Sequence, residues 1–167
     1  MVRIVALFSA VGLVLSAGII IPRENREKGT PPPVENAAAG AKQLLEALKH
    51  NAPELGGAFF FPEDAFDLLK DASNPRRYHQ KLKKWYTDDI KNEHPRFKNG
   101  NWQFEKLTLG RCRWKAVGAE ANKLPYWSCI GNFVTATDGK KRRRFEIRVL
   151  INWGEAWYVT HLGPIRH

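Results

Sequence analysis

The sequence predicts an α+β fold in which three N-terminal helices pack on a curved, four-stranded antiparallel meander. Apolar residues recur at helical spacing between residues 36 and 92, then alternate with polar residues between 102 and 162. The alternation is clearest at 145–151, and turn signals flank it at Asp138-Gly139 and at 152–155. A hairpin with one apolar face needs a covering layer, which the helices upstream can supply.

Residues 1–21 are predicted to be a signal peptide or a membrane anchor. Arg3 precedes an apolar run at 4–21, which is longer than the usual core of a signal peptide (about 7–15 residues) and near the lower limit for a membrane span. The small residues at 16–18 suit cleavage, but cleavage there leaves three isoleucines at the mature terminus. Both alternatives stay open. Each predicts an exported, periplasmic or extracytoplasmic protein, attached to the membrane through 4–21 if the run is uncleaved.

A proline-rich linker is predicted at 22–34, followed by one domain at 35–167. The linker carries mixed charges and then three consecutive prolines at 31–33, so it is expected to be semi-extended and to add nothing to a core. The remaining chain is long enough for one domain with a substantial core.

Three helices are expected in the first part of this domain. The first begins near Asn36, which can act as an N-cap, and ends before Pro53. The second begins at Pro62, where two acidic residues suit the positive end of a helix. The third spans about 75–92 and begins after a Ser-Asn-Pro break.

Four strands are expected after the helices. The first covers 102–117 with a bend at Gly110, and the second covers 126–137. The last two form a hairpin over 142–152 and 157–162.

The two cysteines, Cys112 and Cys129, fall on the first two strands. An exported protein favours a disulfide between them, whereas a reducing compartment would leave two small buried thiols. If they lie opposite each other, the hairpin is centred on Glu120 and Ala121, inside the loop expected from composition. A cross-strand disulfide is therefore geometrically feasible.

The turn at Asp138-Gly139 leaves two registers open for the next strand pair. A two-residue turn places Phe133 opposite Arg144, and a three-residue loop places it opposite Phe145. The apolar match favours the longer loop.

The formal charge of +10 is concentrated in the second half of the chain. Residues 23–74 hold 6 basic and 9 acidic side chains, whereas 75–148 hold 19 and 7. Such a field favours anionic partners, although a solvated basic surface explains it equally well. The candidate anion-binding residues form a run at a hairpin tip, Lys140, Lys141, Arg142, Arg143 and Arg144, and three alternating basic residues at 111–115 could extend it. Because no nucleic-acid-binding motif accompanies the run, a lipid headgroup or cell-wall polymer fits an exported protein better than nucleic acid.

The element order and the closing segments, 145–151 and 155–162, resemble domains of the nuclear transport factor 2-like superfamily (SnoaL-like and ketosteroid-isomerase-like, cystatin-like fold). Many members end in a strand, a turn and a Trp-Tyr-x-x-x-Leu-like strand. The resemblance implies a sheet curled into a cone, with helices closing a pocket. Members bind small apolar molecules, catalyse isomerisation or hydration, or act only as binding and dimerisation modules. The resemblance also implies a homodimer formed through the outer sheet face.

Catalysis of the ketosteroid-isomerase type needs a carboxylate base and a nearby hydroxyl or acid that donates to an oxyanion. The candidates are Asp89 on the inner face of the third helix, with Tyr78 or Tyr86, and His161 in the last strand as a proton donor. Each has a structural explanation as well, a solvated helix carboxylate or a hydrogen-bonded strand histidine.

Six tryptophans could line a ligand cavity or fill a small core. The candidate ligand-binding residues are Trp85, Trp114 and Trp127. The histidine and cysteine spacings predict no metal site, and no cofactor is expected because the sequence has no phosphate-binding loop or dinucleotide fingerprint.

These observations predict an exported, non-enzymatic binding or interaction module with a basic surface and a small hydrophobic pocket. Its partner would be a small apolar ligand or an anionic surface. The first alternative is an isomerase or hydratase with Asp89 as general base. The second is an adaptor that binds anionic lipid or polymer through the basic run.

Overall fold

A computed structural model describes residues 19–164 of the 167-residue chain. The predicted signal or anchor falls almost entirely on 1–18, outside the described residues. Between 19 and 164, no helix is both long enough and apolar enough to cross a membrane.

The three predicted helices are present. They are α1 (Ala38–His50), α2 (Glu63–Leu69) and α3 (Pro75–Glu93), and short 3-10 turns occupy Arg23–Asn25, Val34–Ala37, Pro53–Phe59, His94–Arg96 and Ala119–Ala121. The Asn74 side chain accepts a hydrogen bond from Arg77 N at 2.9 Å, so it caps α3 ahead of Pro75 as expected. Asn36 does not cap α1, because it lies in a 3-10 turn and donates to the Glu155 carbonyl at 2.8 Å.

Five strands form one antiparallel sheet, β1 (Gln103–Thr108), β2 (Arg111–Lys115), β3 (Tyr126–Thr137), β4 (Arg142–Trp153) and β5 (Ala156–His161). The order is β1-β3-β4-β5, and β2 also pairs with β3. The single first strand expected from the sequence is therefore divided into β1 and β2 at the predicted bend. A Cβ at Gly110 would lie 2.1 Å from the Ile130 carbonyl oxygen, so only glycine allows the chain to pass so close to β3 there.

The register between β3 and β4 differs from both predicted alternatives. Phe133 lies opposite Glu146, and the apolar partner of Phe145 is Val134. The reason is a four-residue loop at 138–141, in which the Asp138 carboxylate accepts hydrogen bonds from the backbone N–H groups of residues 140 and 141 at 2.9 and 2.7 Å. An Asp side chain that satisfies these donors stabilises a longer loop than a two-residue Asp-Gly turn.

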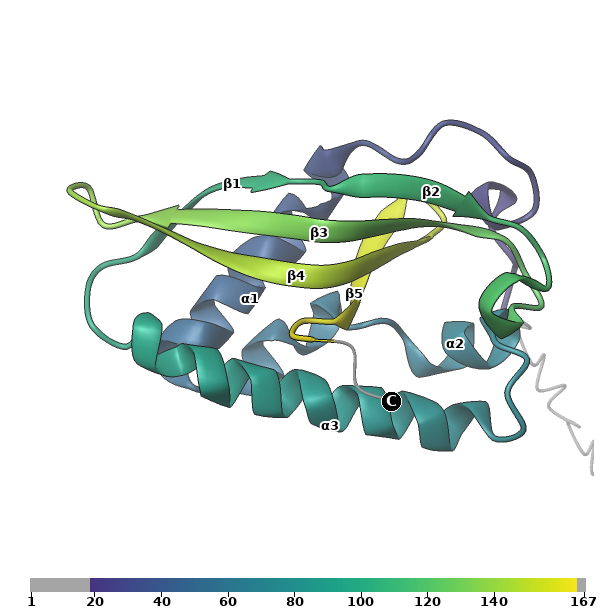
Figure 1. The fold of residues 1–167 in the computed structure, drawn as a ribbon, viewed down its shortest axis with the longest axis horizontal. Coiled ribbons are helices and arrows are strands. Elements are labelled where there is room, and N and C mark those ends of the chain that lie inside the picture. The colour runs from purple at the N-terminus through teal and green to yellow at the C-terminus, as the bar shows by residue number, and fades with distance from the viewer. Residues whose placement is uncertain (1–18, 165–167) are drawn as a thin grey trace, which may run out of the picture.

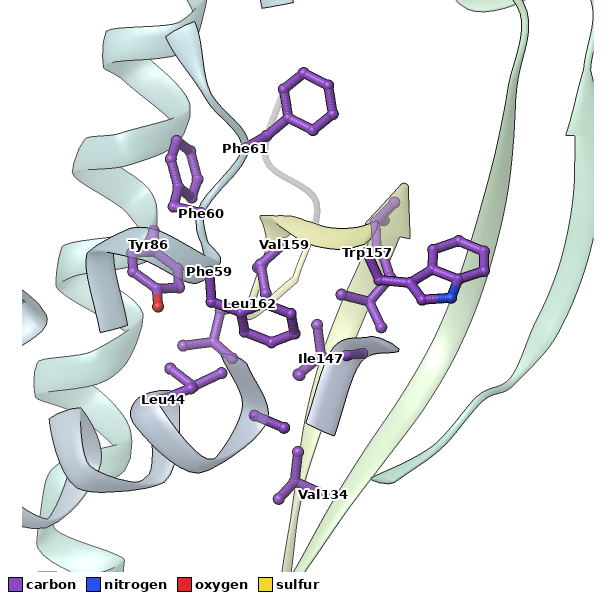
Figure 2. Close-up of a cluster of buried hydrophobic side chains, with 14 of the residues drawn as sticks. Leu44, Phe59, Phe60, Phe61, Tyr86, Val134, Ile147, Trp157, Val159 and Leu162 are labelled. Carbon is purple, nitrogen blue, oxygen red and sulfur yellow. The ribbon is translucent and has the colours of Figure 1, made fainter. Parts of the chain in front are cut away.

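The helices lie against the sheet and enclose one hydrophobic core. In Figure 1, α2 and α3 form the layer below the sheet, and α1 contacts β1 and α3 at one end. Figure 2 shows Leu44 and Phe59 from the helical half facing Val134 and Ile147 from the sheet. All four of these side chains are at least 97% buried. The predicted α+β arrangement of helices on a sheet is confirmed.

The segment expected to be a free linker packs on the domain. Asn25 is fully buried, donates to the Pro125 and Asn152 carbonyls at 3.2 and 3.3 Å, and accepts from Gly154 N at 2.7 Å. Farther along, the Trp157 indole N–H donates to a proline carbonyl of the segment at 3.1 Å. One buried amide that satisfies three backbone groups fixes this segment, a contribution that its proline-rich composition does not reveal.

Candidate ligand-binding cavity

One face of β3 and β4 is divided into two ends that differ in how they are covered. Opposed pairs along this face are Val134 with Phe145, Ile130 with Val149, and Ser128 with Ile151. We call the first part the closed end; its members are Phe97, Trp102, Val134, Phe145 and Ile147. We call the second part the open end; its members are Tyr126, Ser128, Ile130, Val149 and Ile151.

Aromatic side chains fill the space over the closed end. The Phe97 ring lies 5.5 Å from the Phe145 ring and 5.9 Å from the Trp102 ring, both edge to face. Each of these three side chains is 2% exposed or less. This end is packed as an ordinary protein interior.

Over the open end, the helices leave a cavity of about 400 Å³, which we call the open-end cavity. Its size lies in the range of small-molecule sites. The apolar wall comes from the sheet and the two nearer helices: Phe66, Leu82, Ile130, Val149 and Ile151. The polar wall comes from five segments: Lys70, Tyr78, Glu120, Tyr126, Ser128, Thr160 and His161.

Lys70, Glu120 and Tyr126 form a hydrogen-bonded cluster at one end of the cavity. The Lys70 ammonium donates to the Tyr126 hydroxyl at 2.8 Å, to Asn122 Oδ1 at 3.1 Å and to the Glu120 carbonyl at 3.2 Å. The Tyr126 hydroxyl donates to Glu120 Oε2 at 3.1 Å, and Lys115 Nζ lies 2.5 Å from Glu120 Oε1. All three donors of Lys70 therefore have acceptors, and this lysine acts as part of the wall.

The backbone of the loop between β2 and β3 holds this cluster in place. Glu120 and Ala121 both have φ near 53°, in the left-handed region that non-glycine residues seldom adopt. The loop is tied to the end of α2 by the hydrogen bonds of Asp71 N to the Ala121 carbonyl, at 2.7 Å, and of Lys123 N to the Leu69 carbonyl, at 2.8 Å. These tertiary contacts compensate for the strained backbone and place the Glu120 carboxylate at the cavity.

Burial sets the protonation states around the cavity. Desolvation lowers the pKa of Lys70 to about 8, although the charge of Glu120 opposes this shift. Desolvation also raises the pKa of Tyr126 and Tyr78 and lowers the pKa of His161, and the positive charge of Lys70 lowers the pKa of His161 further. Burial disfavours ionisation of Glu120, but the hydrogen bond and charge of Lys115 outweigh it and lower the pKa of that carboxyl. Near pH 7 the wall therefore presents neutral hydroxyl and imidazole groups beside a paired lysine and carboxylate.

The structure separates the candidate catalytic residues. Tyr78 and His161 line the open-end cavity, whereas Asp89 does not. Asp89 lies eleven residues after Tyr78 on α3, roughly 16 Å along the helix axis, and accepts a hydrogen bond from Gly163 N at 2.9 Å. Tyr86 is buried and donates to the Gly56 carbonyl at 2.9 Å. The open-end cavity therefore brings Tyr78 and His161 together without Asp89, the carboxylate expected to act as the base in isomerisation.

The three candidate tryptophans do not share a cavity either. Trp114 and Trp127 face each other across β2 and β3, with ring centroids 5.7 Å apart. Trp85 lies on α3, 6.4 Å from the His161 ring. None of the three lines the open-end cavity.

The basic run does not form one patch. Arg142 pairs with Glu105 at 2.8 Å, and the guanidinium groups of Arg143 and Arg144 lie 4.6 and 4.3 Å from the ring centroids of Trp102 and Phe133. Lys140 and Lys141 are exposed in the loop. Because consecutive strand residues point to opposite faces, the run is split between the two sides of the sheet.

A larger hollow of about 870 Å³ lies beside Asp89, and two ion pairs line it. Arg96 pairs with Glu93 at 2.5 Å, and Arg148 pairs with Glu146 at 3.0 Å. Such mutual pairing leaves little unsatisfied charge for a ligand.

No sequence pattern predicted that Lys70, Glu120 and Tyr126 belong to one site, because these residues come from three separate segments of the chain. The alternation of side chains along β3 could have identified Tyr126. Tyr126 is two residues before Ser128 and therefore shares its face, the one opposite to Trp127 and Cys129.

The disulfide between Cys112 and Cys129 is formed, with the two Cα atoms 3.9 Å apart. Among residues 19–164, no three His, Cys, Asp or Glu side chains gather as a metal site would require. Comparison with family models, with curated proteins and with solved structures finds no match for the chain.

Proposed function

We propose that the protein is an exported, non-enzymatic binding module of the nuclear transport factor 2-like type. Its ligand would be a small and largely apolar molecule held in the open-end cavity. The observation that carries this proposal is that cavity, about 400 Å³ between the sheet and α2 and α3. A cavity of this size, with an apolar wall and convergent polar groups, is the usual form of a small-molecule site.

Two further observations support the proposal. The disulfide fits an oxidising compartment outside the cytoplasm and hence export. The order of helices and sheet strands fits the nuclear transport factor 2-like pattern, in which a curled sheet and its helices surround a pocket.

The same contacts weigh against the two alternatives. An isomerase or hydratase would need Asp89 in the cavity, and this carboxylate instead binds the backbone of Gly163. An adaptor would need the run at 140–144 as one surface, and its arginines are engaged with Glu105 and two aromatic rings.

Homodimerisation stays a prediction, and analytical ultracentrifugation of residues 22–167 would test it.

The test is binding of a neutral fluorescent probe, N-phenyl-1-naphthylamine. The wild-type domain is expected to enhance its fluorescence in a saturable way. Val149→Phe adds bulk to the cavity wall and is expected to weaken binding at least tenfold. The matched control is Val117→Phe, because Val117 is 63% exposed and does not line the cavity. No saturable binding, or equal binding by both variants, would contradict the proposal.

A further inference from the structure

Three basic side chains of β2 stand beside the open-end cavity. Alternation along β2 places Arg111, Arg113 and Lys115 on one face. Their partners on β3 are Ile130, Ser128 and Tyr126, respectively. Directly opposed residues of an antiparallel pair point to the same side. The three basic side chains therefore continue the cavity wall formed by the three β3 residues, all of which line the cavity.

Arg111, Arg113 and Lys115 form a basic strip, and its positive charge is largely unpaired with carboxylates. Lys115 pairs with Glu120, but among residues 19–164 neither Arg111 nor Arg113 makes an ion pair with a carboxylate, and both are exposed. The adjoining hollow lined by the strip also includes Ser128 and Ile130 and has a volume of about 290 Å³. Together, the linings of this hollow and of the open-end cavity contain four basic side chains and one carboxylate: Lys70, Arg111, Arg113, Lys115 and Glu120. An anion placed there would gain hydrogen bonds and charge attraction without displacing an existing partner.

The adjacent apolar wall is deep and continuous with the core. Phe66 and Leu82 are buried on the helical side, and Val149 and Ile151 are buried on the sheet side. Ile130 joins the two regions, because it lines both hollows and is 41% exposed. An exposed isoleucine opposite an unpaired arginine provides contact for a molecule that is apolar at one end and anionic at the other.

We propose that the cavity binds an amphipathic anion, with its apolar body between the sheet and α2 and α3 and its carboxylate or phosphate head at Arg111 and Arg113. This inference rests on the proposed binding function and adds the chemical class of the ligand. The guanidinium group suits such heads because its planar fork donates two parallel hydrogen bonds. The basic run at the hairpin tip lacks a neighbouring apolar cavity of this kind, since the hollow beside Arg142 is lined mainly by charged residues and threonines.

The test compares decanoate, decyl phosphate, decanol and decyltrimethylammonium as competitors of N-phenyl-1-naphthylamine. At low salt, the two anions are expected to bind roughly tenfold more tightly than decanol, and the cation more weakly. Raising the ionic strength from about 0.01 to 1 M shortens the screening length from about 30 to 3 Å and is expected to remove most of this preference. Inorganic phosphate alone is expected to displace nothing, because it lacks the apolar body.

The paired variants are Arg111→Gln/Arg113→Gln and Lys140→Gln/Lys141→Gln, each of which removes two positive charges. The first is expected to abolish the preference for decanoate over decanol, at about threefold per arginine, and to leave decanol binding unchanged. The second is expected to keep the full preference, because its lysines lie at the hairpin tip. Both pairs are exposed, so near-ultraviolet circular dichroism should match the wild type.

The outcomes separate the two proposals. If decanol and decanoate compete equally while Val149→Phe abolishes both, the binding function stands and the anionic ligand class is overturned. Displacement by inorganic phosphate alone would also overturn the amphipathic ligand. If the probe does not bind and no decyl compound binds, both proposals fail.

Discussion

The closed and open ends belong to the same strands and the same sheet face, yet one is core and the other is a cavity wall. At the closed end, Phe97 packs on Phe145, and Trp102 packs on Phe97. At the open end, the opposed residues are Ser128 and Ile151, and the covering side chains include the charged Lys70. Tight aromatic cover excludes ligand, whereas sparser cover with polar groups leaves space for one. The side chains that cover a strand segment, more than its own residues, therefore decide whether it becomes part of the core or the wall of a cavity.

The difference in cover between the closed and open ends predicts that the largest loss of stability will follow a substitution of Phe145. Phe145→Ala removes a ring that is 2% exposed and leaves a cavity at the closed end. Its expected cost is about 3–5 kcal/mol of the free energy of unfolding, measured by urea denaturation. The matched change, Ile130→Ala at the open end, removes a side chain that is 41% exposed and should cost below about 1 kcal/mol. Similar losses for the two variants would remove the distinction between the ends.

The second prediction concerns the disulfide. Cys112 and Cys129 alternate with Arg111, Arg113 and Ser128, so the bond lies on the sheet face opposite the open-end cavity. The Cys112→Ala/Cys129→Ala variant is expected to lose about 3 kcal/mol, since the bond closes a loop of 17 residues.

Wild-type protein unfolded in the presence of a thiol reductant should show the same loss and serves as the control. Probe binding to the double variant is also expected to weaken, because the bond reinforces the pairing of β2 with β3. A variant with unchanged stability would show that packing alone holds β2 in place.

The third prediction concerns Asn132, which lies between the two ends. Its side chain is fully buried, donates to the Cys129 and Ile147 carbonyls at 2.9 and 3.0 Å, and accepts from Gly110 N at 3.0 Å where β1 passes into β2. Asn132→Leu leaves these backbone groups without partners and is expected to cost about 2 kcal/mol.

The control for Asn132→Leu is Asn36→Ala, which removes one exposed hydrogen bond and should cost about 0.5–1 kcal/mol. Thermal melting of both variants measures the difference. A loss at Asn132 no larger than at Asn36 would contradict this account of the sheet bend.

The smallest predicted effect is the titration of Lys70. In a lysine-13Cε-labelled sample, one resonance should titrate near pH 8 and be absent from Lys70→Met, because burial lowers the pKa of Lys70 from 10.5 to about 8. Between these values the unfolded chain binds more protons than the folded chain, so this group makes the free energy of unfolding rise with pH across that window. If every lysine titrates with a pKa near 10.5, Lys70 is as hydrated as a surface lysine and the open end does not desolvate it.

Much of the fold could be predicted because its signals are local. Period-3.6 and period-2 patterns identified the helices and strands. The counting rule for antiparallel pairs showed that Cys112 could lie opposite Cys129, and the structure has them paired. The bend at Gly110 was also predicted from composition. The β3–β4 register was not, because it depends on how the Asp138 carboxylate folds a four-residue loop.

The candidate site was predicted less well, because its members are distant in the sequence. Of the candidate catalytic residues, Tyr78 and His161 line the cavity and Asp89 does not. The cluster of Lys70, Glu120 and Tyr126 forms where the end of α2, a strained loop and β3 meet, and no spacing rule joins residues that are fifty or more positions apart.

By itself, the sequence determined the element types, their order and the concentration of basic charge in the second half. These follow from side-chain periodicity and composition, which act within a few residues or along one hairpin. Only the tertiary structure decided which end of the sheet is filled and which is hollow, that Lys70 is half-buried, and that Asn25 joins the N-terminal segment to the domain through hydrogen bonds. Those outcomes depend on how distant segments pack and on which buried polar groups find partners, and both are properties of the folded chain as a whole.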